Sequence, residues 1–278
     1  MMETVYAVMD VLLPFEMFSY TFMKNALLAM LLITPLFGLL GTMAVDNKMA
    51  FFSDALGHSA LTGIALGVVL GVASQQVSML LFGILWAALI TFIKQRSTTS
   101  ADTIISVFSS TSIALGLVIL SHGGAFAKYS NYLVGDILSV SPPDIGWLAG
   151  ALAVTAVAWV YLFNPLLLTS VNTPLARSRG VKSRQVEYAF VILVAITVML
   201  SIRWVGTMLI NSLLILPAAA SRNVAKNAAG YIRLSVIFSM FSGVTGLVLS
   251  YYLNTSAGAA VVLVAACLYF ATLPLRRR

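Results

Sequence analysis

Long apolar runs separated by short polar stretches repeat along almost the whole chain. An α-helix needs about 20 apolar residues to cross the hydrocarbon core of a bilayer, and the runs have that length. The pattern therefore predicts an all-α fold, a polytopic transmembrane bundle that occupies residues 22–275 as one domain. The predicted spans are 22–45, 50–72, 77–95, 103–121, 145–164, 185–202, 204–220, 232–253 and 257–274.

The weakest boundary in this pattern lies at Arg203 and Trp204, between two spans of modest length. A connection of one or two residues is very short for two separate helices. The alternative to nine spans is eight, with one re-entrant or broken element, which is tolerated at membrane depth where protein surrounds it.

The composition is that of an integral membrane protein. It is 60% hydrophobic and 9% charged, with a mean hydropathy of +0.99, whereas roughly 25% of the residues of a soluble domain are charged. The formal net charge is +7, but the cations lie in alternate connections and in the tail 276–278. By the positive-inside rule these parts are cytoplasmic and the N-terminus is outside. The positive charge therefore reflects the membrane topology of the chain, and nucleic acid is not an expected partner.

The first 21 residues carry Glu3, Asp10 and Glu16 but no Lys or Arg, which is not how a secretory signal peptide begins. We interpret 1–21 as an interfacial segment that Pro14 interrupts. Cys267 is the only cysteine, so a disulfide framework and a thiolate metal cluster are both excluded. It is expected to be a small buried hydrophobe.

Two ionisable residues, Asp54 and His58, stand one helical turn apart inside span 50–72. Ionisable groups at membrane depth are costly and therefore functional by default. A carboxylate with a neutral imidazole suits Zn²⁺, Mn²⁺ or Fe²⁺. Two ligands hold an ion loosely, as a carrier requires, because it must release the ion again. The alternative is an Asp–His hydrogen bond that locks two helices together.

The same span carries a ridge of small residues beside this pair, formed by Ser59, Gly63, Gly67 and Gly71. Small residues at four-residue spacing allow another helix to approach closely. The polar pair is then expected to point into a helix junction and away from lipid.

Other polar residues have weaker interpretations. His122 and Asp136 belong to the long external connection 122–144 and are expected to be solvated at the interface, with a short helix over Leu133–Val140. Asn211 and Ser212 lie within span 204–220, where they either line a path or cross-link helices; Pro217 frees a backbone carbonyl nearby.

The cytoplasmic stretch 172–183 is polar and basic, and differs from the other connections. Thr173 and Pro174 are typical of a helix start, and Gly180 of a helix end. The stretch is either a docking element for a soluble partner or a charged topological loop. Three enzyme motifs are absent from the chain. It has no G-x-x-x-x-G-K-[ST] loop for ATP hydrolysis and no His-Glu-x-x-His motif of a zinc protease, and Leu133–Asp136 lacks the first glycine of the Gly-x-Gly-Asp motif of two-aspartate intramembrane proteases. These absences are the reason that we do not expect an enzyme.

The run Lys48–Gly67, KMAFFSDALGHSALTGIALG, closely resembles the signature of the ABC-3 permeases, the membrane subunits of bacterial ATP-driven importers of zinc, manganese or iron(II). The resemblance spans about residues 20–275, in order. It continues through Ser100–Ser106, Ala114–Gly116, Tyr132–Ser141, Leu175–Val181 and Arg203–Ala220.

The resemblance implies a permease with a type II importer-like fold in the bacterial cytoplasmic (inner) membrane. Asp54 and His58 would be transient ligands of a transported Mn²⁺, Zn²⁺ or Fe²⁺, with no tightly bound cofactor. Its implied partners are a second copy of the chain, a cytoplasmic ABC ATPase dimer that hydrolyses ATP, an extracytoplasmic metal-binding protein and the lipid bilayer. The implied ATPase-docking residues are Pro174, Leu175, Ala176, Arg177, Arg179 and Gly180.

Two departures from the family pattern stand out. Thr62 occupies a place where many relatives have proline, so the helix is expected to be straighter, and Asp46-Asn47-Lys48 is less basic than usual. Two rival interpretations use the same pair. In an ion-coupled secondary carrier Asp54 and His58 relay protons, and in a membrane enzyme Asp54 is the acid or base.

Overall fold

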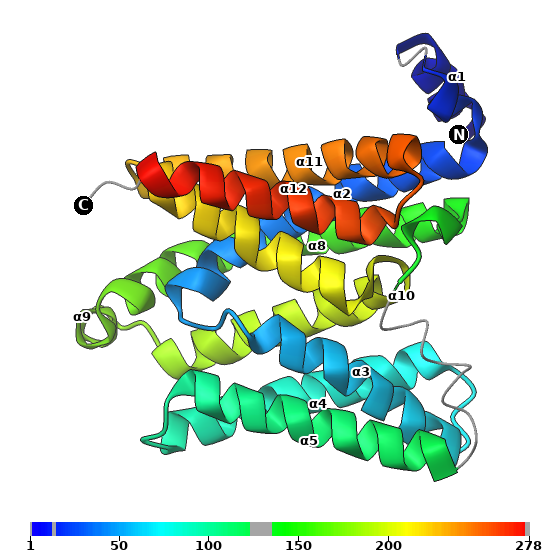
Figure 1. The fold of residues 1–278 in the computed structure, drawn as a ribbon. Helices are drawn as coiled ribbons and strands as arrows, with labels where there is room; N and C mark the ends of the chain where they lie inside the picture. The colour runs from blue at the N-terminus through cyan, green and yellow to red at the C-terminus, as the bar shows by residue number, and fades with distance from the viewer. Residues whose placement is uncertain (1, 13–14, 123–134, 276–278) are drawn as a thin grey trace.

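The computed structural model describes residues 2–12, 15–122 and 135–275, and all the regular structure in these ranges is helical. Figure 1 shows long helices stacked side by side, with their connections gathered at the two ends of the bundle. The elements are α1 (Met2–Leu12), η1 (Glu16–Ser19), α2 (Thr21–Asp46), α3 (Phe52–Val69), α4 (Gln75–Arg96), α5 (Ala101–His122), η2 (Ile137–Ser139), α8 (Pro142–Val171), α9 (Thr173–Ser178), α10 (Ser183–Val224), α11 (Ala228–Leu253), α12 (Ala257–Thr272) and η3 (Leu273–Leu275).

Eight helices of the described ranges are long and apolar enough to cross a membrane: α2, α3, α4, α5, α8, α10, α11 and α12. The all-α transmembrane bundle predicted from the apolar runs is therefore confirmed. Helix α2 lies at its centre, packed against α8, α10 and α11. The tail 276–278, Pro14 and most of the connection 122–144 lie outside the described residues.

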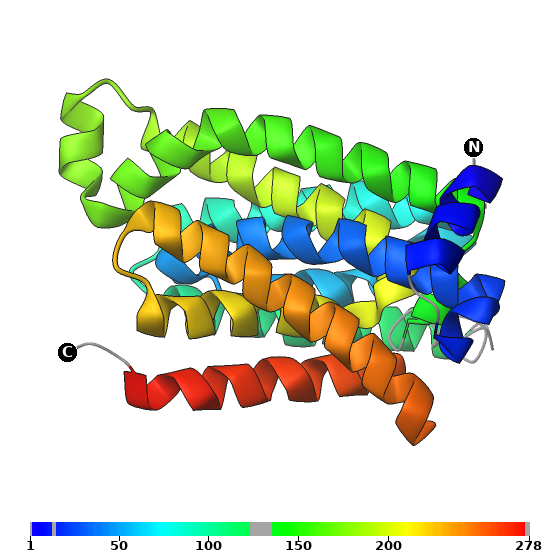
Figure 2. The same cartoon turned by 90° about the horizontal axis from the view of Figure 1, so that it is seen from above.

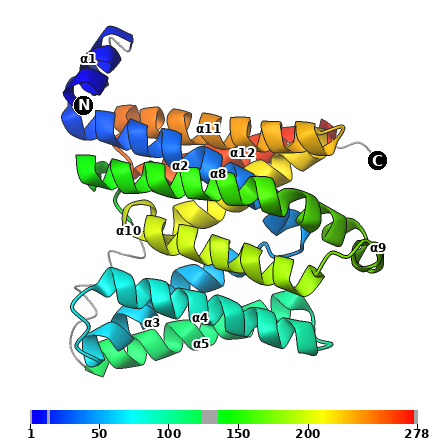
Figure 3. The ribbon, with the colours of Figure 1, turned by 180° about the vertical axis from the view of Figure 1, so that it is seen from behind.

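Helix α10 folds back on itself. A straight helix of its 42 residues would measure about 63 Å, twice the thickness of a bilayer core. Gly206 interrupts it with φ 74° and ψ 163°, and the arms before and after this residue run in opposite directions (Figures 1 and 3). The arms match the predicted spans 185–202 and 204–220. The nine predicted spans and the eight helices therefore describe the same path of the chain.

The break was expected at Arg203 and Trp204, but both residues continue the first arm. The reversal needs a backbone conformation with positive φ that only glycine adopts readily, and Gly206 is the next glycine along the chain. Gly135, from the connection 122–144, packs directly on it. A Cβ atom on Gly135 would lie 2.2 Å from the Gly206 nitrogen, so the two backbones are in contact.

The predicted ridge of small residues on α3 is largely confirmed. Gly63 and Gly67 face α4, where a Cβ at Gly63 would lie 2.8 Å from the Met79 Cα, and Ser59 is fully buried. The ridge ends there. Gly71 lies beyond the helix with φ 69° and no atom within 4 Å of its added Cβ, so its expected packing role is wrong. It is a turn residue, because the helix has already ended.

Helix α3 runs unbroken through Thr62, as expected for a residue that is not proline. The Thr62 hydroxyl donates to the Ser112 carbonyl of α5, and Gly116 leaves room for this contact. Thr62 therefore ties α3 to α5.

The N-terminal segment is fastened to the start of α2 by polar contacts. Lys24 Nζ lies 2.6 Å from Asp10 Oδ1, and the Tyr6 hydroxyl donates to Asn25 Oδ1 over 2.5 Å. Asn25 Nδ2 in turn donates to the Val140 carbonyl, 3.1 Å away, beside η2. Helix α1 and the segment after residue 134 are thus joined through one asparagine.

Cys267 is exposed on α12, which contradicts the expectation that it is buried. It lies in an apolar groove between α11 and α12, among residues such as Phe241 and Leu263. Helix α12 packs on α10 and α11 through buried residues such as Val261 and Ala265, and Cys267 lies outside this buried set.

We predict that Gly206→Ala destabilises the protein by about 1–3 kcal/mol, because an alanine there must adopt a glycine-only conformation. The matched control is Gly150→Ala in α8, where an added Cβ meets no atom within 4 Å and helix propensity favours alanine. Thermal unfolding of the purified proteins should show a lower midpoint for the first variant alone. Equal midpoints would contradict the strain at the reversal.

Candidate metal site

Asp54 and His58 lie on one face of α3, as their spacing predicts. His58 Nε2 is 3.4 Å from Asp54 Oδ1. Among residues 52–65 they are the two that are not buried, with side chains 40% and 25% exposed. The pair therefore faces an open side of this chain, while the other residues from 52 to 65 are packed.

The carboxylate of Asp54 is held by two further helices. Asn211 Nδ2, on the second arm of α10, donates to Asp54 Oδ1 over 2.7 Å. The Ser109 side chain of α5 lies close enough to this carboxylate to interact with it. Three helices thus meet at Asp54.

These contacts show which partners the polar residues of the spans have. Asp54 and His58 are both on α3, so their mutual contact cannot lock two helices; the cross-link runs from Asp54 to Asn211. Sequence reasoning proposed a cross-link by Asn211 but did not find its partner, and it missed Ser109. The signal for Ser109 was a row of hydroxyl residues inside an apolar span. Ser212 bonds its own helix, donating to the Met208 carbonyl.

His122 and Asp136 are exposed, as expected, and neither approaches the pair. Asp136 Oδ1 accepts from the Leu138 N–H and so caps η2. The predicted helix over Leu133–Val140 is wrong in the described part, where only a single 3₁₀ turn forms, Ile137–Ser139. Asp136 and Val140, on either side of this turn, both have extended backbone conformations, and Ile137 and Val140 are buried against the bundle.

An ion at this site would find few protein ligands in one chain. The described residues contain no group of three or more His, Cys, Asp or Glu side chains that could hold a metal. A carboxylate and an imidazole suit first-row divalent ions, but tight sites use about four ligands. The arrangement fits transient binding of a cargo ion.

The predicted helix in the basic stretch 172–183 is confirmed as α9. Asn172 Oδ1 accepts from the Leu175 N–H at its start, and Gly180 ends it with φ 80°. Ala176 is buried, whereas Leu175 is 43% exposed. Figures 1 and 2 show α9 projecting beyond the ends of neighbouring helices. Pro174, Arg177, Arg179 and Gly180 are exposed on it or just after it.

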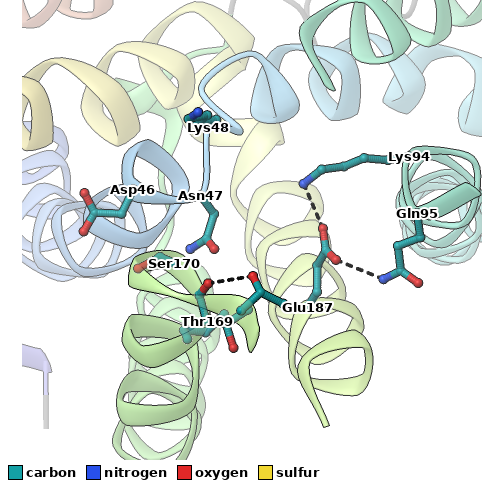
Figure 4. A pocket seen from close by; sticks show the side chains of 10 residues that line it. Asp46, Asn47, Lys48, Lys94, Gln95, Thr169, Ser170 and Glu187 are labelled. Carbon is teal, nitrogen blue, oxygen red and sulfur yellow. Dashed lines mark hydrogen bonds and ion pairs between the residues drawn. The ribbon is translucent and has the colours of Figure 1, made fainter. Parts of the chain in front are cut away.

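A polar cavity of about 310 Å³ opens beside α9 (Figure 4). Glu187 of α10 accepts from Lys94 Nζ over 2.8 Å and from Gln95 Nε2 over 2.9 Å, which joins α10 to α4. The lining also includes Thr173 of α9 and Lys48 in the turn between α2 and α3. The cavity thus separates the projecting helix from the turn that leads into α3.

Comparison with known proteins adds the family context. Residues 19–276 match the family model described as the ABC 3 transport family. The chain is 32% identical over 254 residues to the high-affinity zinc uptake system membrane protein ZnuB of Haemophilus influenzae, covering 91% of this chain and 97% of that protein. It is 31% identical over 252 residues to the manganese import system permease protein ScaB of Streptococcus parasanguinis, covering 90% and 89%.

A solved structure is similar over nearly the whole chain. PsaBC from Streptococcus pneumoniae, in complex with Fab, superposes with a TM-score of 0.80 at 29% identity, covering 97% of this chain and 94% of the other.

Proposed function

The chain belongs to the ABC 3 transport family, and we propose that it is the membrane-spanning permease subunit of an ATP-driven importer of divalent transition-metal ions. Its relatives include proteins named for zinc uptake and for manganese import. The observation that carries the proposal is the Asp54–His58 pair, which faces an open side of an otherwise buried stretch of α3. Mn²⁺, Zn²⁺ and Fe²⁺ all suit this pair.

In this mechanism the ion is cargo and passes between two copies of the chain. An extracytoplasmic metal-binding protein releases it at the outer end of the bundle. Asp54 in its ionised form and His58 in its neutral form then bind it transiently, because only an unprotonated imidazole offers a lone pair to a metal. Water and the facing copy supply the remaining ligands, and the small number of ligands in one chain keeps the ion mobile.

Helix α9 is the proposed docking element for a cytoplasmic ATPase dimer, since this chain has no phosphate-binding loop of its own. Its exposed Leu175 lies beside exposed cations, which suits a groove with an apolar floor and an acidic rim. A movement of α9 would be transmitted to the turn between α2 and α3, because Thr173 of α9 and Lys48 of this turn line the same polar cavity. Glu187, held by Lys94 and Gln95, keeps the far wall of this cavity in place.

The proposed orientation in the bacterial cytoplasmic (inner) membrane places α9 inside and α1 outside. The end of the bundle that holds α9 also carries Lys94, Lys182 and Arg222, and a cytoplasmic excess of cations is the common arrangement. With an odd number of passes, counting the two arms of α10 separately, the N-terminus is outside and the C-terminus inside. A secondary carrier is not favoured, because the chain belongs to the ABC 3 transport family.

We predict that Asp54→Asn and His58→Ala each abolish metal accumulation, because each removes one of the two ligands. A strain that lacks the gene is complemented with the native gene or a variant at equal membrane expression, and total cell metal is measured by elemental mass spectrometry. The native gene should restore one metal and neither variant should. Full restoration by both variants would make the pair structural. Accumulation that survives inactivation of the ATPase would support a secondary carrier instead.

We also predict that Leu175→Asp prevents association with the ATPase subunit, because it places a charge on the exposed apolar residue of α9. The variant should still fold, since the side chain is partly exposed. Co-purification of the ATPase is the measurement, with thermal unfolding as a test of folding. Arg233→Ala, which removes an exposed charge from α11, is the control and should co-purify normally. Normal co-purification of the Leu175 variant would place the docking surface elsewhere.

A further inference from the structure

Asn211 is the polar side chain of α10 that reaches the proposed metal pair. It lies five residues after the reversal at Gly206, on the second arm of the helix. Its Nδ2 donates to Asp54 Oδ1 over 2.7 Å, joining residues 157 positions apart in the chain. This is the length of a hydrogen bond strengthened by charge.

The chemistry of the contact fixes which end of the amide faces Asp54. An ionised carboxylate only accepts hydrogen bonds, so the NH₂ group must point to it and the amide oxygen must point elsewhere. The same oxygen, Asp54 Oδ1, is the atom nearest His58 Nε2. Asn211 therefore acts on the atom through which the two proposed ligands meet.

The arm that carries Asn211 is packed on both sides of this residue. Leu209, Ile210, Leu213 and Leu214 surround it in sequence and are all buried. At the start of the arm, the backbone of Gly135 lies against that of Gly206. The packing places the amide of Asn211 at Asp54.

We propose that Asn211 is a positioning residue of the metal site, which holds the Asp54 carboxylate in the orientation that receives the ion. This inference rests on the proposed function. Partners that orient a metal ligand through a hydrogen bond typically change metal affinity by about 10- to 100-fold when they are removed. Asn211 thus contributes to ion binding without being a ligand itself.

The test uses the full-length permease, purified in detergent, with Mn²⁺ and Zn²⁺ as probes in equilibrium dialysis and with cellular accumulation as a second measurement. Asn211→Ala should weaken binding of the preferred ion by roughly 10- to 100-fold. Asn211→Asp, of almost the same volume, should be at least as harmful, because its carboxylate cannot donate and repels Asp54.

Thr197→Val is the matched control, since it removes a buried interhelical contact of the other arm of α10, to Thr155 of α8. It should leave ion binding unchanged. If Asn211→Ala and Thr197→Val lower the unfolding midpoint alike and both bind ions as the native protein does, Asn211 is only structural and the proposal is overturned.

An exchange of the two residues separates positioning from packing further. The double variant Asp54→Asn with Asn211→Asp restores an amide–carboxylate bond between the same helices, but moves the carboxylate off α3. Stability should return while ion binding and accumulation stay lost. Recovery of accumulation would contradict the proposal. A native protein that neither binds nor accumulates either ion would refute the proposed function itself, whereas native binding in the Asn211 variants would refute this inference alone.

Discussion

A polar side chain inside a bilayer has no water to complete its hydrogen bonds, so each one must find its partner within the protein. Several side chains of the bundle find such partners on neighbouring helices as well as on their own helix. Ser235 and Ser239 of α11 donate to the carbonyls of Gly38 and Thr34 on α2, and Thr62 of α3 donates to α5. Small residues at these crossings let the backbones come close enough for such bonds. The same side chains that would destabilise a lone helix in lipid therefore hold its neighbours in register.

The proposed metal pair is an exception that the rest of the bundle accommodates. Asp54 is charged in the proposed mechanism, and a charge at membrane depth is costly unless it is bonded or solvated. Asn211 supplies a hydrogen bond from α10, Ser109 of α5 lies nearby, and partial exposure to solvent supplies the rest. A fully satisfied carboxylate would have no capacity left for an ion. The site combines enough bonding to be stable with enough exposure to bind.

Much of this arrangement could be predicted from the sequence, because the dominant signals are local. The length of an apolar run sets a span, and Thr173-Pro174 with Gly180 marks both ends of α9. The spacing of Asp54 and His58 already placed them on one face. What escaped prediction depends on distant segments. Nothing near Asn211 indicates Asp54, and nothing distinguishes Gly206 among nineteen glycines until Gly135 is seen against it. Cys267 was misjudged because apolar surroundings in a membrane protein do not distinguish a packed face from a lipid-facing one.

The reversal of α10 also determines the direction in which each later helix crosses the membrane. If the chain continued straight through residue 206, α11 and α12 would traverse the membrane in the opposite sense and their ends would exchange sides. The Arg222–Asp46 ion pair joins the end of the second arm to the end of α2, which precedes the reversal, so it could not form. A single pair of backbone torsions thus decides on which side of the membrane the last quarter of the protein is assembled.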